Sequence, residues 1–313
     1  MAAGSSVSAP FLTPQYHEVR RPNRSRVAIL HCEDYSQKIE EIVFRGLQLF
    51  QLDLRGKSVV LKPNLVDYIT GNAINTHPLL AGAAAESFRR LGAKEVVVAE
   101  GPGHQRDTQL VLCESGYAPI LRENEIRFID LNRDELIPVK LRASYSTMKR
   151  LSLPRTLVQA DVLVSMPKVK THHWSGVTLS MKNMFGVVPG NKYGWPKNIL
   201  HWHGIQECIL DLCATVPINF VIADAVVAME GNGPLNGTPR PLGKIVLSGD
   251  PVAADATCAR LMGLEPDRVV HVREAAKFLG NSSPKLIVQV GETVRSPDVP
   301  FSVVPEFGFL RQA

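Results

Sequence analysis

The sequence ADVLVSMPKVKTHHWSGVTLSMKNMFGVVPG, residues 160–190, holds the strongest structural signal in the chain. It opens on an unbroken apolar run from Val162 to Met166, which Asp161 precedes and Pro167 ends. A short run of this kind predicts a strand that is buried on both faces, as in the parallel sheets of α/β proteins. Polar residues begin where this strand ends.

A cluster of polar, mostly basic residues follows the strand. Its members are Lys168, Lys170, Thr171, His172 and His173. On an extended segment alternate positions face the same way, so Lys168, Lys170 and His172 share one face and His173 lies on the other. Because ligands of open α/β sheets bind at the carboxyl ends of strands, this position favours a ligand site over the plain alternative, a solvated basic loop.

A second polar segment carries Thr178, Lys182 and Asn183. If it is helical, Thr178 and Lys182 are four residues apart and share a face. The apolar neighbours of Lys182 predict that its amine is partly desolvated. Desolvation lowers the pKa of a lysine and suits a base or nucleophile, whereas a nearby carboxylate raises that pKa. We expect Glu230 or Asp255 to pair with Lys182, because an unpaired buried lysine is costly. Asn183 is expected to bind substrate or, alternatively, a buried backbone group.

The composition of the chain is that of an ordinary globular protein. Of its 313 residues, 45% are hydrophobic and 21% are charged. No stretch approaches the roughly 18 to 20 apolar residues of a membrane span, and no signal peptide is evident. Residues 1–24 are expected to form a disordered extension. We therefore expect a cytoplasmic protein without a membrane partner.

The formal net charge of +5 is concentrated near one end of the chain. Within the first 26 residues, four arginines and one glutamate give a net +3, which leaves +2 for the remainder. A surface that follows a nucleic-acid backbone needs a larger excess of basic residues, with aromatic side chains interleaved among the Arg or Lys residues. This sequence has neither feature. The sequence therefore argues against a nucleic-acid partner and indicates a small anionic ligand.

The cysteines are few and dispersed. They are Cys32, Cys113, Cys208, Cys213 and Cys258, with no C-x-x-C pair among them. This spacing argues against a disulfide framework and a zinc ribbon. An iron–sulfur cluster of the ferredoxin type is not expected either, because it needs closely spaced cysteines. We expect these cysteines to serve as small apolar side chains of the core.

Strand-like and helix-like segments alternate along the chain. The predicted strands are 27–31, 58–61, 95–99, 126–130, 162–166, 218–223, 244–248 and 285–290, with a paired ribbon over 136–145. The predicted helices are 36–53, 78–92, 153–160, 205–215, 252–263 and 266–280. Such alternation predicts an α/β fold with a mainly parallel sheet and helices on both faces. We expect one domain over 25–313, with two lobes, about 25–150 and 151–313, around a cleft as the alternative.

Further candidates follow the strands of the first half. Lys62 and Asn64 stand at the end of the strand at 58–61, where Lys62 would hold a phosphate or carboxylate. Thr76 and His77 precede Pro78, which suits the first turn of a helix and favours a pre-organised loop. Glu100 follows the strand at 95–99 between glycine-containing turns, and a ligand role and a simple turn are equally open there.

The second half supplies the acidic candidates. Glu230 and Asn232 lie in a glycine-rich segment, whose backbone would wrap closely around a ligand or form an ordinary turn. Asp250 precedes Pro251, so a helix N-cap is its simplest role, although it also belongs to the candidate substrate-binding set. Asp255 lies among alanines and is expected either to pair with a site lysine or to face solvent in the first helical turn.

Six motifs in order carry a resemblance to a known family. They are KPN at 62–64, THP at 76–78, PKVKTH at 167–172, TLSMKNMFG at 178–186, MEGNGP at 229–234 and GDPVAADA at 249–256. Over roughly residues 57–265 the chain resembles the family called domain of unknown function 362. Some members carry a ferredoxin-like module, which this chain lacks. A fainter similarity, in a two-lobed α/β protein with a Lys/His-lined cleft, is to the lactate racemase family, whose members use a nickel pincer cofactor.

Three functions remain open at this point. The first, which we favour, is an enzyme acting on a small anionic substrate, with Lys182, His172 and Glu230 as catalytic residues and the other lysines binding charge. The second is a metal- or nickel-cofactor-dependent enzyme with His77, His172 and His173 as candidate ligands, although no recognised ligand spacing is present. The third is a non-catalytic cofactor-binding or assembly protein. The cofactor is unknown, and a homo-oligomer is one option for the assembly state.

The strand-end rule also predicts where these residues meet. Lys62, Lys168, His172, Glu230 and Asp250 each follow a predicted strand of one sheet. Because the carboxyl ends of parallel strands lie along one edge of a sheet, we expect all five in a single cleft.

Overall fold

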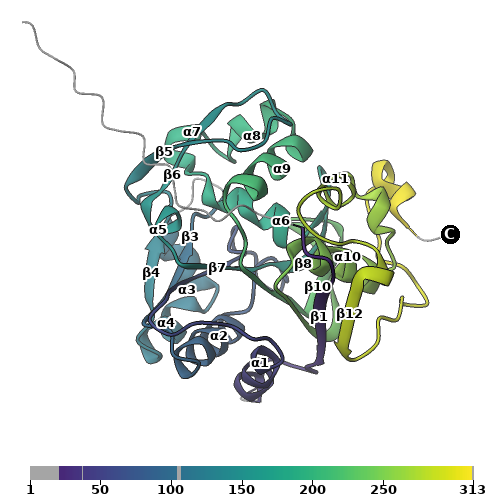
Figure 1. Cartoon of the computed structure of the whole chain (residues 1–313), viewed down its shortest axis with the longest axis horizontal. Helices are drawn as coiled ribbons and strands as arrows, with labels where there is room; N and C mark the ends of the chain where they lie inside the picture. Colours follow the sequence, from purple (N-terminus) through teal and green to yellow (C-terminus); the bar gives the residue numbers. More distant parts are fainter. Residues whose placement is uncertain (1–20, 37, 104–106, 312–313) are drawn as a thin grey trace, which may run out of the picture.

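One large sheet organises the structure, a computed structural model that describes residues 21–36, 38–103 and 107–311 (Figure 1). Among these residues ten strands join in the order β12-β1-β11-β10-β7-β2-β3-β4, and β8 pairs with both β10 and β9. The first six are β1 (Ser25–His31), β2 (Ser58–Pro63), β3 (Glu95–Glu100), β4 (Arg127–Asp130), β7 (Val162–Met166) and β8 (Lys168–His172). The others are β9 (Gly176–Thr178), β10 (Phe220–Asn232), β11 (Asn236–Ser248) and β12 (Ile287–Gly291).

Most neighbouring strands of this sheet are parallel. The antiparallel contacts are those of β11 with β1 and β10, and of β9 with β8. A separate antiparallel pair is formed by β5 (Leu136–Lys140) and β6 (Arg150–Pro154). The predicted α/β class with a mainly parallel sheet is therefore confirmed.

Helices cover both faces of the sheet, because each buried strand is apolar on both sides. Along β2, Val59 and Leu61 belong to one apolar cluster, and Val60 belongs to the other. The first cluster is covered by α1 (Ile39–Gln48), α2 (Pro78–Arg90), α3 (Thr108–Glu114) and α4 (Tyr117–Glu123). The second is covered by α5 (Arg155–Val158), α6 (Ser180–Asn183), α8 (Asn198–Trp202), α9 (Ile205–Thr215), α10 (Pro251–Leu261) and α11 (Val270–Ala275). Between α6 and α8 lies the short helix α7 (Gly190–Tyr193).

Two helix starts follow the predicted pattern. Proline occupies the first position of α2 and of α10, where its missing N–H costs nothing. His77 caps α2 by accepting a hydrogen bond from the Leu79 N–H. Asp250 caps α10 by accepting from the N–H groups of Val252 (2.8 Å) and Ala253 (3.1 Å). The predicted capping role of Asp250 is confirmed.

The segment around Lys182 differs from the sequence prediction. Thr178 ends the strand β9 and lies opposite Lys170 of β8, so it does not share a helix with Lys182. Gly176 adopts a positive φ of 81°, which turns the chain back after β8. The β-branched residues Val177 and Thr178 then pair with β8, and the helix α6 starts only at Ser180.

Smaller differences concern the ends of elements. The predicted strands 218–223 and 244–248 are the buried ends of one long hairpin, β10 with β11, because pairing continues outward past the sheet. The predicted helix 266–280 is shortened to a turn of 3₁₀-helix at Pro266–Arg268 followed by α11. Of the extension predicted to be disordered, residues 1–20 lie outside the described residues. Within its described part, Arg21 and Pro22 are hydrogen-bonded to Asn281.

Asp255 fixes the position of α6. Its carboxylate is buried and accepts hydrogen bonds from the backbone N–H groups of Ser180 (2.7 Å) and Met181 (3.0 Å). Burial raises the pKa of Asp255 to about 7, and these two hydrogen bonds oppose that rise. Asp255 therefore pairs with the start of α6, neither with a lysine nor with solvent as the sequence suggested.

We predict that Asp255→Ala lowers the free energy of unfolding by about 2 to 5 kcal/mol, because it leaves two buried N–H groups without an acceptor, each costing about 1 to 3 kcal/mol. Urea unfolding measures this loss. Asp255→Asn keeps one acceptor oxygen and should lose less. Equal stability of Asp255→Ala and wild type would contradict the anchoring role of Asp255.

Candidate functional site

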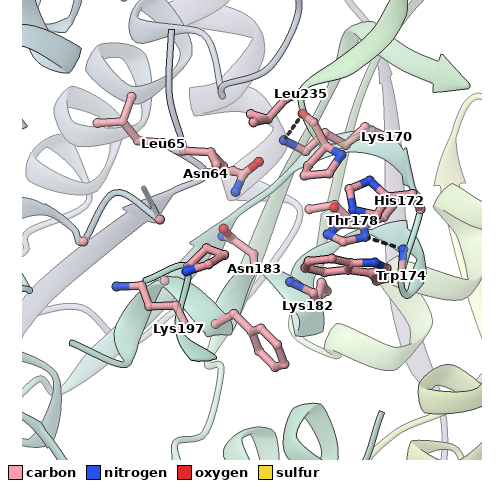
Figure 2. Close-up of a pocket in the computed structure, with 18 of the residues that line it drawn as sticks. Asn64, Leu65, Lys170, His172, Trp174, Thr178, Lys182, Asn183, Lys197 and Leu235 are labelled. Atoms are coloured by element: carbon pink, nitrogen blue, oxygen red, sulfur yellow. Dashed lines mark hydrogen bonds between the residues drawn. The ribbon is translucent and has the colours of Figure 1, made fainter. Parts of the chain in front are cut away.

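A pocket opens where β2, β8 and β9 end, and we call it the lysine pocket because Lys170, Lys182 and Lys197 line it (Figure 2). Its walls come from the β2–α2 loop, the β8–β9 hairpin, the segment from α6 to α8 and the β10–β11 turn. Its volume is about 860 Å³ when the open mouth is included. Three amines and three imidazoles of the described residues lie on its walls beside apolar side chains such as Phe185 and Leu235.

Two of the three lysines of the pocket are held by neutral oxygen atoms. Lys170 donates to the backbone oxygen of Ile74 (2.7 Å), and Lys197 donates to the side-chain oxygen of Asn132 (2.7 Å). Burial lowers the pKa of Lys170 well below its ordinary value, and lowers that of Lys197 to about 7. Neither contact supplies a full negative charge.

The carboxylate of the pocket is Glu100, at the end of β3. Its Oε1 is paired with Lys62, whose amine also donates to the side-chain oxygen of Asn183 at 3.0 Å. Burial raises the pKa of Glu100 and lowers that of Lys62. The pair lies against the backbone of Gly186, where a Cβ would come within 2.1 Å of Glu100 Oε1 and 2.6 Å of Lys62 Nζ. Only glycine fits at this position.

Lys182 differs from the other lysines in having no hydrogen-bond acceptor or carboxylate among the described residues. Its amine faces the interior of the pocket (Figure 2) and lies 4.0 Å from the centroid of the Phe185 ring. Burial, followed by the charge of Lys62, lowers the pKa of Lys182 to about 7. The expected pairing with Glu230 or Asp255 is absent, so desolvation decides the state of this amine.

Magnitudes support that conclusion. A fall from 10.5 to about 7 in the pKa of Lys182 corresponds to roughly 5 kcal/mol against the charged form. The cation–π contact with Phe185 favours the charged form by only about 0.5 to 2 kcal/mol. Near neutral pH a large share of Lys182 is therefore a neutral amine.

The histidines of the β8–β9 turn add ring nitrogens to the pocket wall. His172 Nδ1 accepts from the backbone N–H of Trp174 (3.0 Å), so the neutral ring carries its proton on Nε2. Burial, then the charge of Lys182, lowers the pKa of His172 well below its ordinary value. His173 Nδ1 contacts the backbone oxygen of Gly233 (2.7 Å). His201 lies 4.9 Å from the Trp174 ring, centroid to centroid, across the same wall.

The three histidines proposed as metal ligands do not come together. His172 and His173 line the lysine pocket, whereas His77 stacks on Tyr35 beside another pocket. Within residues 21–36, 38–103 and 107–311, no group of three or more His, Cys, Asp or Glu side chains is placed to hold a metal ion. His77, His172 and His173 therefore do not form one metal site, and no chemical step is derived through a metal.

Three buried polar atoms at the described walls of the pocket lack a hydrogen-bond partner. They are Asn64 Oδ1, Glu100 Oε2 and Thr178 Oγ1. Buried polar atoms without partners are rare in folded proteins, because each costs about 1 to 3 kcal/mol. Their gathering on the walls of one pocket leaves three hydrogen-bonding positions there for water or for a polar ligand.

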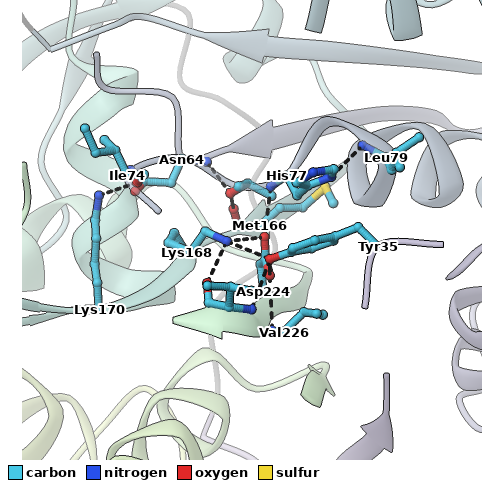
Figure 3. A network of polar contacts seen from close by, with 12 residues as sticks. Tyr35, Asn64, Ile74, His77, Leu79, Met166, Lys168, Lys170, Asp224 and Val226 are labelled. Atoms are coloured by element: carbon cyan, nitrogen blue, oxygen red, sulfur yellow. Dashed lines mark hydrogen bonds and ion pairs between the residues drawn. The ribbon is translucent and has the colours of Figure 1, made fainter. Parts of the chain in front are cut away.

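A second polar cluster, the Asp224 network, lies under the β2–α2 loop (Figure 3). Asp224 accepts from Lys168 Nζ (2.7 Å), from the Tyr35 hydroxyl (2.7 Å) and from the backbone N–H of His77 (2.8 Å). Nearby, the Thr76 hydroxyl donates to the backbone oxygen of Met166 (2.6 Å). This network fixes the loop that carries Asn64 and Ile74 to the lysine pocket.

Several predicted site residues lie elsewhere. On the β10–β11 hairpin, Glu230 is paired with Arg240 and accepts from the backbone N–H of Ser302, so the turn of this hairpin reaches the pocket but Glu230 does not. Asn232 ends the same strand, and the Thr171 hydroxyl donates to the Gly231 oxygen there (2.8 Å).

Asp250 also lies away from the pocket. It caps α10 just after β11 ends, and β11 runs antiparallel to β10, so its carboxyl end is at the opposite edge of the sheet. The five residues expected in one cleft therefore divide. His172 lines the lysine pocket and Lys62 lies beneath it, whereas Lys168, Glu230 and Asp250 do not reach it.

Glu100 was a candidate in the sequence, where a ligand role and a simple turn were equally open, and the structure places it on the pocket wall. Other pocket residues were not singled out from the sequence, among them Trp174, Phe185, Lys197 and His201. Lys197 and His201 come from a stretch of short helices and turns with no periodic pattern, so only the three-dimensional structure shows them.

The sequence of the chain shows its family. The family described as domain of unknown function 362 matches residues 59–260. This chain belongs to that family. All six motifs predicted to carry the resemblance lie inside the matched range, and the predicted family membership is confirmed.

A curated relative and two solved structures are also similar to this chain. A thylakoid-associated protein of Synechocystis sp. is 28% identical over 223 residues, which are 67% of this chain and 64% of that protein. The chain thus spans slightly less than two thirds of that relative.

The lactate racemase apoprotein of Thermoanaerobacterium thermosaccharolyticum has a TM-score of 0.43 at 15% identity, covering 72% of this chain and 56% of that chain. A protein of Thermotoga maritima has a TM-score of 0.36 at 13% identity, covering 68% and 55%. These structural likenesses are too distant to carry a functional argument. In the part of this chain that the structure describes, no helix has the length and apolar character needed to cross a membrane.

We predict that Asp224→Ala lowers the free energy of unfolding by about 3 to 5 kcal/mol, because it leaves the buried amine of Lys168 without its counter-charge. The double variant Lys168→Met/Asp224→Leu removes both charges and should recover part of the loss. Denaturant unfolding of wild type, the single variants and the double variant forms a thermodynamic cycle. If the loss in the double variant equals the sum of the losses in the two single variants, the coupling of these two residues is contradicted.

We predict that Lys182→Met stabilises the free protein by roughly 0.5 to 2 kcal/mol near neutral pH, because it removes a desolvated amine. The folded pKa of Lys182, about 7, lies below the ordinary value of 10.5, so the folded state binds fewer protons than the unfolded state between these values. The wild type therefore gains stability as the pH rises through this window and loses it as the pH falls. Urea unfolding should show the largest advantage of the variant below about pH 7 and a shrinking one by about pH 9. A less stable variant at both pH values would show that Lys182 is a paired cation.

Proposed function

We propose that the protein is an enzyme that binds a small carboxylate or phosphate in the lysine pocket and transfers protons on it. The observation that carries this proposal is the set of three unpartnered buried polar atoms on the described walls of a pocket that three buried lysines line. A small anionic ligand would supply the missing negative charge and accept a hydrogen bond from the Thr178 hydroxyl, and a hydroxyl group on the same ligand would donate to the acceptor oxygens of Asn64 and Glu100.

Electrostatics support an anion. The one carboxylate among the described residues that line the pocket, Glu100, is already shared with Lys62. Within the same part of the chain, Lys170, Lys182 and Lys197 have no carboxylate partner, and their pKa values are lowered by burial. An opposite charge within about 4 to 6 Å favours the charged form of an amine. Binding of an anion would therefore offset the desolvation of these buried amines.

Proton transfer is supported by the two groups whose pKa values are displaced toward each other. Lys182 has a pKa of about 7, so its neutral form is available to accept a proton at neutral pH. Burial raises the pKa of Glu100, and its Oε2 has no hydrogen-bond partner among the described residues. His172 Nε2–H and the Thr178 hydroxyl would donate hydrogen bonds to the anion. A purely binding protein needs the cations but gains nothing from a half-neutral lysine.

We predict that anion binding takes up protons. Acetate and sulfate are suitable probes because their charges stay constant between about pH 6 and pH 9. Above pH 7 Lys182 and Lys197 are mostly neutral, and the bound anion would raise their pKa values, so protons must be taken from the buffer. Affinity should fall by up to about tenfold per pH unit for each proton taken up.

Calorimetry in two buffers with different ionisation enthalpies measures the proton uptake. Lys182→Met should bind with less uptake, and Lys192→Met, which removes an exposed lysine of α7, should behave as wild type. Absence of binding by either anion would contradict an anion pocket. An observed binding enthalpy that is the same in both buffers would contradict the assignment of half-neutral lysines.

A further inference from the structure

We propose that Lys182 is a nucleophile that condenses with the carbonyl group of a 2-oxo carboxylate to form a Schiff base. This inference rests on the proposed function, because the carboxylate of such a substrate is the anion of the lysine pocket. It deepens that function by naming both the substrate class and the covalent step.

The first support is the lack of an acceptor for Lys182. Lys62, Lys170 and Lys197 each donate to an oxygen at 3.0 Å or less, which favours their charged forms and fixes their amines in place. Lys182 has no such acceptor among the residues that the structure describes. Within this described set, no hydrogen bond favours its ammonium form or turns its nitrogen away from a ligand.

The second support is the immediate surroundings of this amine. The ring of Phe185 lies 4.0 Å away, centroid to nitrogen, and Pro196 and Leu235 add apolar surface to the pocket walls. Lys62 acts on Lys182 as a like charge. Apolar walls and a neighbouring cation are the two conditions that keep a lysine neutral and nucleophilic. Exclusion of water also protects an imine from hydrolysis.

The third support is the position of the anion donors. Thr178 lies opposite Lys170 on the β8–β9 hairpin, and His172 is two residues further along the same face of β8. Lys182 follows Thr178 by four residues, and Figure 2 shows these side chains on one wall of the pocket. A carboxylate held by His172 and Thr178 would place the adjacent carbonyl carbon toward the Lys182 amine. A ligand with a carboxylate and a carbonyl on neighbouring carbons fits this arrangement.

The chemical step balances with one proton from solvent, which enters through the open mouth of the pocket. The lone pair of the neutral Lys182 Nζ forms the C–N bond, and the carbonyl oxygen takes one proton from the amine to give a carbinolamine. A proton from solvent is then added to that hydroxyl group, the C–O bond breaks and water leaves. The products are a protonated imine on Lys182 and one water molecule, so charge and atoms are conserved.

Reductive trapping tests the proposal on the full chain. The protein is incubated with pyruvate or glyoxylate and sodium cyanoborohydride, and intact-mass and peptide mass spectrometry then locate the adduct. We expect one reduced adduct per chain, located on Lys182. The extent of modification of Lys182 should exceed that of any other lysine at least tenfold, and excess acetate should suppress it. Lys182→Arg should lose the adduct, whereas Lys192→Met should keep it.

Acetate binding, measured by calorimetry, separates the two proposals. Acetate binding without an adduct on Lys182 overturns the Schiff-base inference and leaves the anion pocket standing. Loss of both acetate binding and the adduct overturns both. Modification spread evenly over exposed lysines also overturns the inference. Because the wild-type peptide map locates the adduct by itself, the test does not depend on the folding of Lys182→Arg.

Discussion

Desolvation of lysine amines at the strand ends is the constraint on which this site depends. Lys62, Lys168 and Lys170 are at most 2% exposed, and each is buried in β2 or β8 near the pocket edge of the sheet. A buried ammonium needs compensation, and the structure supplies it in three ways: Glu100 for Lys62, Asp224 for Lys168, and backbone oxygens for Lys170. Two of these groups also tie the β2–α2 loop to the sheet, since Lys170 donates to the oxygen of Ile74 and Asp224 accepts from the N–H of His77.

The β2–α2 loop shows this double role. Near the end of this loop, the backbone N–H of His77 donates to Asp224, and the backbone oxygen of Ile74 accepts from Lys170. Between them the Thr76 N–H donates to the oxygen of Asn64 (2.9 Å), closing the loop on itself. Asn64 is thereby fixed at the pocket wall with its side-chain oxygen unpartnered among the described residues. Hydrogen bonds to Lys170 and Asp224, both buried in the sheet, therefore hold this loop in place.

Sequence patterns predicted the parts of the site that follow from local rules. Lys62, Lys170, His172 and Lys182 were found because strand ends and their following loops hold ligands in α/β sheets. Alternate spacing did place Lys168 on the face of Lys170, yet it could not show that Asp224, 56 residues away along the chain, captures its amine. The long β10–β11 hairpin and the pocket residues from the α7–α8 segment depend on contacts between distant parts of the chain, which periodicity does not encode.

The family motifs divide between residues that form the pocket and residues that hold it. KPN, PKVKTH and TLSMKNMFG supply its cations and donors, whereas GDPVAADA supplies Asp255, which never reaches the pocket but anchors the helix of Lys182. MEGNGP supplies Gly233, whose oxygen holds His173. α6 is only four residues long, so it cannot hold a lysine in an apolar place by its own stability. Asp255 does so from α10, and this explains why a motif far from the pocket belongs to the same set.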